Sequence, residues 1–110
     1  MDVGRANTVY EMLRRANYTK NQAKILALLE QVNSASMAEI VGLLGITQSR
    51  ATSAVHGLMR LAVVQRMAVK ARPGRGRTTF VYRLTATIDD LLSRKPVTLE
   101  VKYDPDGQDQ

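Results

Sequence analysis

The chain has 110 residues, which fits one domain, and 45% of them are hydrophobic while 24% are charged. It contains no cysteine, which excludes structural disulfides and thiolate metal sites, and we expect neither a signal peptide nor a membrane span. The formal net charge is +6, and no acidic residue occurs between Glu39 and Asp89, where eight basic residues lie. A basic segment of this kind inside a folded chain favours a polyanionic partner.

Apolar residues at helical spacing predict two helices in the first third of the chain. The first spans about residues 5–16, with Val9, Met12, Leu13 and Ala16 on its apolar side. Before the second, Thr19 and Gln22 have the spacing of a capping box, in which a hydroxyl and an amide side chain satisfy backbone N–H groups reciprocally. The apolar face of this second helix consists of Ile25, Leu26, Leu28, Leu29 and Val32.

A third, shorter helix is predicted over residues 37–44. Ser36 and Glu39 form a second capping box at its start. Gly45 lies where a helix is followed by a residue in the left-handed conformation. The inward residues of this helix are expected to be Met37, Ile40, Val41 and Leu44.

A fourth helix is predicted to begin after Thr47, a good N-cap residue, and to extend over about residues 48–60. Ile46 is expected to pack between the third and fourth helices and to fix their angle. Ala51 is small, which allows the two helices to approach closely. Val55 and Leu58 complete the apolar side, with Met59 as a further candidate.

The period of the pattern then changes from that of a helix towards that of a strand. Residues 64–72 and 78–84 are predicted strands, and residues 73–77, Pro-Gly-Arg-Gly-Arg, are predicted as a five-residue loop between them. A last helix is predicted over residues 88–94, capped by Thr85 or Thr87. Residues 97–103 alternate between apolar and polar and predict a further strand, which a polar tail follows.

The predicted fold class is mainly α with a small β-hairpin (α+β). We expect one domain over residues 1–95, including the N-terminal helix, and a C-terminal strand and polar tail over residues 96–110. A short helix, a turn with glycine and a second helix are the ingredients of a helix-turn-helix.

The residues predicted to contact DNA lie at the start and outer face of the fourth helix and in the hairpin. Gln48 can read adenine, and Arg50 can read guanine or hold a phosphate. Arginine at the loop tip suits a narrow minor groove. The predicted DNA-binding residues are Thr47, Gln48, Ser49, Arg50, Thr52, Ser53, His56, Arg72, Arg75, Arg77 and Thr78.

The run from Ala38 to Leu61 resembles a winged helix-turn-helix, and the hairpin with Val81-Tyr82-Arg83-Leu84-Thr85 resembles its wing and exit. The pattern is similar to MarR-type and related bacterial or archaeal transcription regulators over roughly residues 20–92. The resemblance implies a three-helix core with a wing and flanking terminal elements, a recognition helix over about residues 48–60 and a wing tip over about residues 72–78. Such regulators usually have glycine where this chain has Ala62.

We therefore expect a sequence-specific double-stranded DNA-binding transcription regulator, a repressor that acts as a homodimer and lies in the cytoplasm on the nucleoid. The predicted helix over residues 5–16, the predicted strand over residues 97–103, or both are candidates for the dimer contact. We expect no enzymatic activity, because the chain has neither a cysteine nucleophile nor a second histidine. No metal, cofactor, membrane contact or small-molecule effector is expected.

Two other functions are compatible with the sequence. A winged helix can instead serve as a protein–protein interaction module, although such a module does not need Arg72, Arg75 and Arg77 together. A non-specific architectural or replication-associated DNA binder is the other alternative. Steep salt dependence without sequence preference would identify it.

Overall fold

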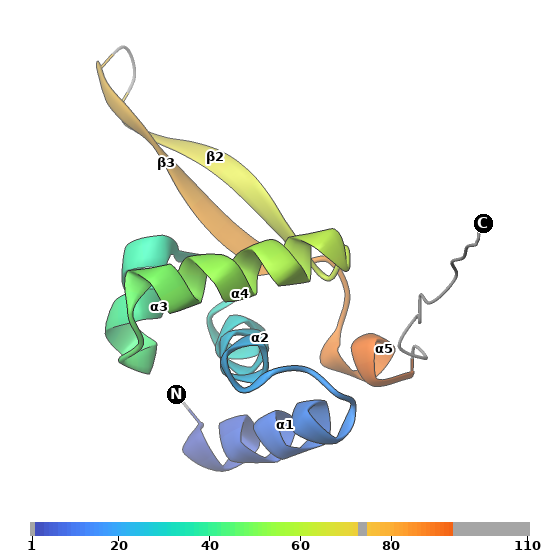
Figure 1. Cartoon of the computed structure of the whole chain (residues 1–110). Coiled ribbons are helices and arrows are strands. Elements are labelled where there is room, and N and C mark those ends of the chain that lie inside the picture. The colour runs from blue at the N-terminus through green and yellow to red at the C-terminus, as the bar shows by residue number, and fades with distance from the viewer. Residues whose placement is uncertain (1, 73–74, 94–110) are drawn as a thin grey trace, which may run out of the picture.

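A computed structural model describes residues 2–72 and 75–93, which form five helices and a small antiparallel sheet (Figure 1). The elements in chain order are α1 (Val3–Arg15), α2 (Lys20–Val32), β1 (Ala35–Ser36), α3 (Met37–Leu44), α4 (Gln48–Arg60), β2 (Val64–Arg72), β3 (Arg75–Leu84) and α5 (Ile88–Ser93). The expected mainly helical α+β composition is confirmed. The predicted strand over residues 97–103 and the rest of 96–110 lie outside the described residues. No helix within the described ranges is long and apolar enough to cross a membrane.

Side-chain caps begin the helices where the sequence predicts them. Both capping boxes form: the Thr19 hydroxyl accepts the Gln22 N–H at 3.2 Å, and the Ser36 hydroxyl accepts the Glu39 N–H at 3.2 Å. The Gln22 and Glu39 side chains accept the N–H groups of the two cap residues in return. Of the two candidates before α5, Thr87 is the cap, since its hydroxyl accepts the Asp90 N–H. Each such cap stabilises a helix by about 1 kcal/mol.

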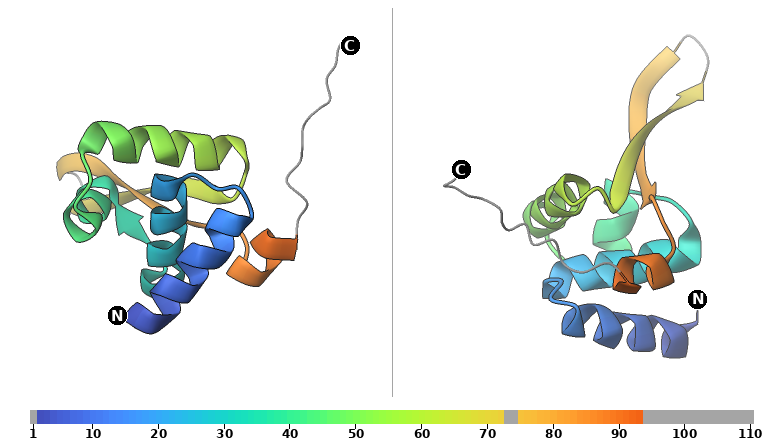
Figure 2. Two further views of the ribbon diagram at one scale, coloured as in Figure 1. Left: turned by 60° about the horizontal axis from the view of Figure 1, so that its bottom comes forward. Right: turned by 90° about the vertical axis from the view of Figure 1, so that its right-hand side faces the viewer.

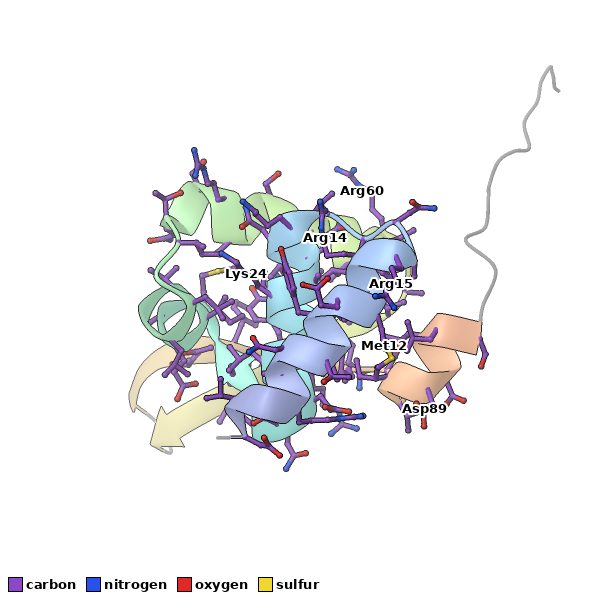
Figure 3. All side chains as sticks on the ribbon, turned by 90° about the horizontal axis from the view of Figure 1, so that it is seen from below. Met12, Arg14, Arg15, Lys24, Arg60 and Asp89 are labelled. Carbon is purple, nitrogen blue, oxygen red and sulfur yellow. The ribbon has the colours of Figure 1, made fainter. Side chains whose placement is uncertain are left out.

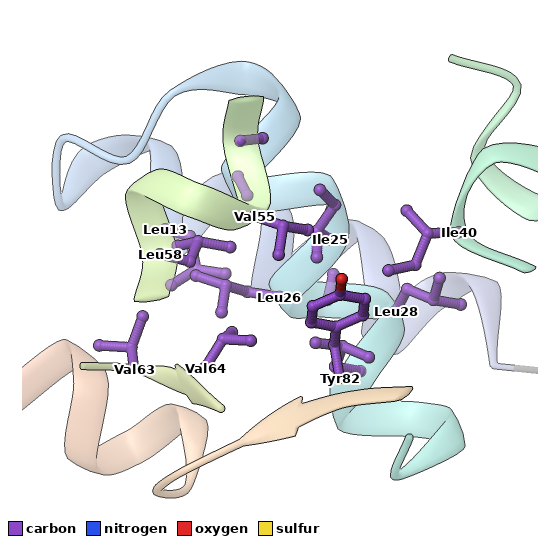
Figure 4. Close-up of a cluster of buried hydrophobic side chains, with 14 of the residues drawn as sticks. Leu13, Ile25, Leu26, Leu28, Ile40, Val55, Leu58, Val63, Val64 and Tyr82 are labelled. Atoms are coloured by element: carbon purple, nitrogen blue, oxygen red, sulfur yellow. The ribbon is translucent and has the colours of Figure 1, made fainter. Parts of the chain in front are cut away.

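All five helices contribute to one hydrophobic core (Figure 4). The terminal helices are part of this core and do not merely flank it: Val9 and Leu13 of α1 and Ile88 and Leu91 of α5 are all buried. Several residues predicted to face inward are only half-buried against the core, namely Met12, Val32, Met37, Val41, Leu44, Ile46 and Met59, and Ala16 is half-buried at the end of α1.

The sheet has the strand order β1-β3-β2, and both pairings are antiparallel. The sequence did not predict β1, which has two residues and pairs Ala35 with Tyr82 and Ser36 with Val81. The predicted five-residue loop is wrong: β2 extends to Arg72 and β3 begins at Arg75, and these two residues are register partners. The register shifts between Lys70 and Arg72, so the pairing of β2 with β3 is irregular at this point.

The β2–β3 hairpin projects out of the helical body beyond α3 and α4, while α1 and α5 lie on the other side of the body (Figures 1 and 2). Within residues 64–69 and 79–84 of the hairpin, Val64 and Tyr82 at its base are buried and belong to the core. α4 contacts β2 at this base, so the hairpin rises from the helical body next to α4 (Figure 1).

Candidate functional site

The turn between α3 and α4 fixes how α4 lies on the body. Gly45 ends α3 in the left-handed conformation, with φ 66° and ψ 32°, and its N–H donates to the Val41 carbonyl at 2.9 Å. A side chain with a Cβ would be strained in this conformation, so glycine suits the position. Thr47 then begins α4, and its hydroxyl accepts the Arg50 N–H at 3.2 Å. The turn predicted over Gly45, Ile46 and Thr47 is confirmed.

One side of α4 packs against α2 and α3 and the opposite side is open to solvent. Ala51, Val55 and Leu58 on the packed side are fully buried, and Ala54 is nearly so. On the open side, four exposed residues fall within about 60° of one another around the helix at 3.6 residues per turn. They are Ser49, Ser53, His56 and Arg60.

Gln48 and Arg50 are exposed on either side of this line. We call the six exposed residues together the polar stripe of α4: Gln48, Ser49, Arg50, Ser53, His56 and Arg60. Five of the six belong to the set predicted from the sequence. Arg60 was not included, although its spacing from His56 places it on the same face.

Two predicted site residues on α4 have structural roles. Thr47 caps the helix, and its oxygen is occupied by the Arg50 N–H. Thr52 is half-buried, and its hydroxyl lies 4.0 Å from the Met37 sulfur of α3. Thr52 therefore points along the α3–α4 contact and does not belong to the polar stripe.

The hairpin is joined rigidly to the end of α4. The N–H groups of Ala62 and Val63 donate to the Met59 and Leu58 carbonyls at 3.0 and 3.1 Å, the two hydrogen bonds of a Schellman motif. Ala62 adopts a positive φ of 62° in this motif, at the position where the resembling regulators have glycine. The Thr85 hydroxyl donates to the Ala62 carbonyl at 2.7 Å, which ties the end of β3 to the same junction.

The two faces of the hairpin carry different side chains. Because alternate residues of a strand share a face, Arg66, Ala68 and Phe80 lie on the face of the core residues Val64 and Tyr82. We call this the helix-side face. The opposite, outer face consists of Gln65, Met67, Val69, Thr79, Val81 and Arg83.

Arg66 and Phe80 interact on the helix-side face, just beyond the core. The Arg66 guanidinium carbon lies 4.3 Å from the centroid of the Phe80 ring, which is cation–π geometry. Both side chains are exposed, and Phe80 is 41% exposed. Neither residue is among those predicted from the sequence. The signal that could have found Arg66 is the strand alternation, because residues 64 and 66 of a strand share a face.

Positive charge dominates α4 and the hairpin because residues 40–88 contain no carboxylate. In the described part of the chain, the one ion pair joins Arg5 of α1 to Glu30 of α2 at 2.6 Å, and this contact raises the pKa of Arg5. Further cations lie on the first two helices, including Arg14 and Arg15 near the end of α1 (Figure 3).

The predicted hairpin residues Arg72, Arg75, Arg77 and Thr78 all belong to the backbones of β2 and β3. Arg72 ends β2 as predicted, whereas Arg75 and Arg77 belong to β3 and not to the loop in which the sequence placed them. Their side chains lie outside what the structure describes, as do Pro73 and Gly74. The structure brings α4 and the base of the hairpin together around the junction at Ala62.

Comparison of the chain with protein-family models, with curated proteins and with solved structures gives no match. Among the described residues, no group of three or more His, Asp and Glu side chains is arranged to hold a metal ion. The site is therefore interpreted from its own geometry, which is an exposed polar helix face and a projecting hairpin with no carboxylate on either.

Proposed function

We propose that the protein is a winged helix-turn-helix that binds double-stranded DNA sequence-specifically and regulates transcription. In this proposal α3, the turn at Gly45 and α4 are the helix-turn-helix, α4 is the recognition helix and the β2–β3 hairpin is the wing. The observation that supports it most is the polar stripe of α4, which is exposed along the whole helix, while neither α4 nor the hairpin contains a carboxylate.

The chemistry of the polar stripe suits DNA. Arg50 and Gln48 at the start of the helix have side chains that can form paired hydrogen bonds with base edges in a major groove. Ser49 and Ser53 can hydrogen-bond phosphate oxygens, and Arg60 adds a cation at the other end of the helix. The α4 N-terminus is capped by Thr47, so the stripe is presented on an ordered helix.

The test is selection of bound sequences from a random duplex library at about 150 mM salt, near physiological ionic strength. We expect wild type to enrich one sequence, and Arg50→Ala to lose that preference at a cost of about 1–3 kcal/mol if Arg50 contacts a base. Arg15→Ala is the matched control. It removes one positive charge from an exposed position on α1, and the variant should retain the sequence preference. Binding without enrichment would instead identify a non-specific DNA binder.

A second candidate function is contact with another protein, and it is favoured by the outer face of the hairpin. Met67 and Val69 are 39% and 45% exposed there, and half-buried Val81 lies opposite Met67 on the same face. Exposed apolar residues grouped on one face are typical of interaction surfaces. If wild type binds no duplex in the selection, this function takes precedence.

A further inference from the structure

We propose that Arg66 and Phe80 form a phosphate-binding clamp on the helix-side face of the hairpin, with Phe80 holding the Arg66 guanidinium in place for the DNA backbone. This inference rests on the proposed DNA binding. The sequence predicted hairpin contacts with DNA only over residues 72–78, and the clamp adds a specific contact nearer the base of the hairpin. It also states which face of the hairpin meets DNA.

The position of the pair supports the clamp. Arg66 is the register partner of Tyr82, which is 8% exposed, and Phe80 is the next residue along β3 on the same face. The pair therefore lies where the hairpin leaves the core, near the end of the hairpin that contacts α4. A duplex whose major groove receives α4 would bring a backbone strand to this corner.

The chemistry of the pair supports a phosphate as the ligand. The guanidinium carbon of Arg66 lies over the Phe80 ring, and the N–H donors of an arginine lie around the edge of its guanidinium. Within the described residues, no carboxylate or carbonyl accepts a hydrogen bond from Arg66. These donors match the oxygens of a phosphate, which arginine can bind in bidentate fashion.

The ring gives the arginine a defined position before DNA arrives. A free arginine loses rotamer freedom when it binds, and stacking on an aromatic ring reduces that loss. Ala68, the register partner of Phe80, has only a methyl group, so it leaves the ring room to lie across the strands. The exposed part of the ring can in turn pack against the apolar surface of a deoxyribose. Phe80 is thus a positioning residue, and Arg66 makes the ionic contact.

Arg83 provides a matched control within the same hairpin. It is exposed and lies on the opposite face of the hairpin. Its register partner is Gln65, and this pair is adjacent to the pair of Arg66 and Tyr82. Substituting either arginine with glutamine removes one positive charge from the hairpin. A purely long-range electrostatic effect would affect DNA binding similarly for both variants, whereas a clamp makes only Arg66 important.

The experiment measures duplex affinity as a function of salt for wild type, Arg66→Gln, Arg83→Gln, Phe80→Leu and Phe80→Tyr, on the selected sequence or, without one, on a mixed-sequence duplex. We expect Arg66→Gln to bind roughly tenfold more weakly, the low end for a hydrogen bond to a charged group. The slope of log affinity against log salt should become shallower by about 0.9 for the lost phosphate contact. Arg83→Gln should bind like wild type.

The two Phe80 variants separate positioning from packing. Phe80→Leu should weaken binding about two- to fivefold, which corresponds to an exposed cation–π interaction, and Phe80→Tyr should restore it because the ring remains. Thermal melting of each variant controls for folding. Equal losses for Arg66→Gln and Arg83→Gln, or wild-type binding by Phe80→Leu, would overturn the clamp while leaving DNA binding intact. Absence of duplex binding by wild type would overturn the proposed function and the clamp together.

Discussion

At the scale of single residues, the clearest conflict between sequence and conformation is Ala62. Three non-glycine residues have positive φ in the described part of the chain, and two of them are asparagines, Asn17 and Asn33, which tolerate this region best. The third is Ala62, at the end of α4. An L-residue with a simple Cβ loses about 1–2 kcal/mol in the left-handed region. This strain lies at the junction between α4 and β2, which orients the hairpin.

Replacing this alanine with glycine is therefore expected to stabilise the protein. Relief of the left-handed strain exceeds the roughly 0.4–1 kcal/mol that glycine costs through the unfolded chain, so Ala62→Gly should raise the free energy of unfolding by about 0.5–1 kcal/mol. Urea denaturation followed by circular dichroism measures the change. Ala68→Gly is the control: φ at Ala68 in β2 is not positive, and glycine there should destabilise. A loss of stability in Ala62→Gly would contradict this account of the junction.

At the scale of elements, the features that could be predicted are those determined by a few neighbouring residues. The two capping boxes, the left-handed Gly45 and the Thr47 cap depend on chemistry within four residues, and all of them form. The bounds of α3 and α4 follow from these signals. The alternation of β2 was predicted for the same reason, since a strand has a period of two residues.

The features that could not be predicted depend on parts of the chain that are far apart. β1 exists because Ala35 and Ser36 pair with Tyr82 and Val81. β2 has its predicted bounds, but β3 begins three residues earlier than the sequence predicts because pairing of Arg72 with Arg75 overrides the low strand propensity of glycine and proline nearby. The contact between Arg66 and Phe80 also requires the register. For the candidate site, the sequence therefore predicted α4 well and the hairpin poorly.

The contact between α2 and α4 shows how two elements constrain each other through a glycine. A Cβ on Gly57 of α4 would lie 2.6 Å from Nε2 of Gln22, the residue that closes the capping box of α2. Nε2 is the far end of the Gln22 side chain, and Oε1 of the same amide accepts the Thr19 N–H at 3.1 Å, so moving Nε2 away would disturb that hydrogen bond. The glycine in the middle of α4 and the cap of α2 are thus in contact.

A double-mutant cycle tests this coupling. Gly57→Ala alone gains about 1 kcal/mol of helix propensity but disturbs the capping box, so we expect little net change in stability. In a Gln22→Ala background the obstacle is gone, and Gly57→Ala should stabilise by close to the full amount. The coupling energy from urea denaturation of the four proteins should exceed 0.5 kcal/mol, above the usual error for independent sites. Additive effects would show that Gln22 does not limit the approach of α4.

At the scale of the whole molecule, the structure bears on how two copies could associate. The first helix was one candidate for the dimer contact. Its apolar side is occupied within the chain, because Val9 and Leu13 are fully buried against the core. Met12, on the same helix, lies between α1 and α5 (Figure 3). An interface built from this apolar side would require the core to open, so the predicted strand over residues 97–103 is the other dimer candidate to test.

We therefore expect that deleting residues 96–110 converts a homodimer into a monomer without unfolding it. The described core ends with Ile88 and Leu91 of α5, so the melting temperature of the truncated chain at low concentration should stay close to that of the full chain. Sedimentation velocity over a range of concentrations measures the change in mass. A truncated chain that remains dimeric would place the interface within residues 1–95. A full-length chain that is monomeric at every concentration would remove the homodimer. A single α4 would then bind one half-site, and palindromes with half-sites about 34 Å apart should not be enriched.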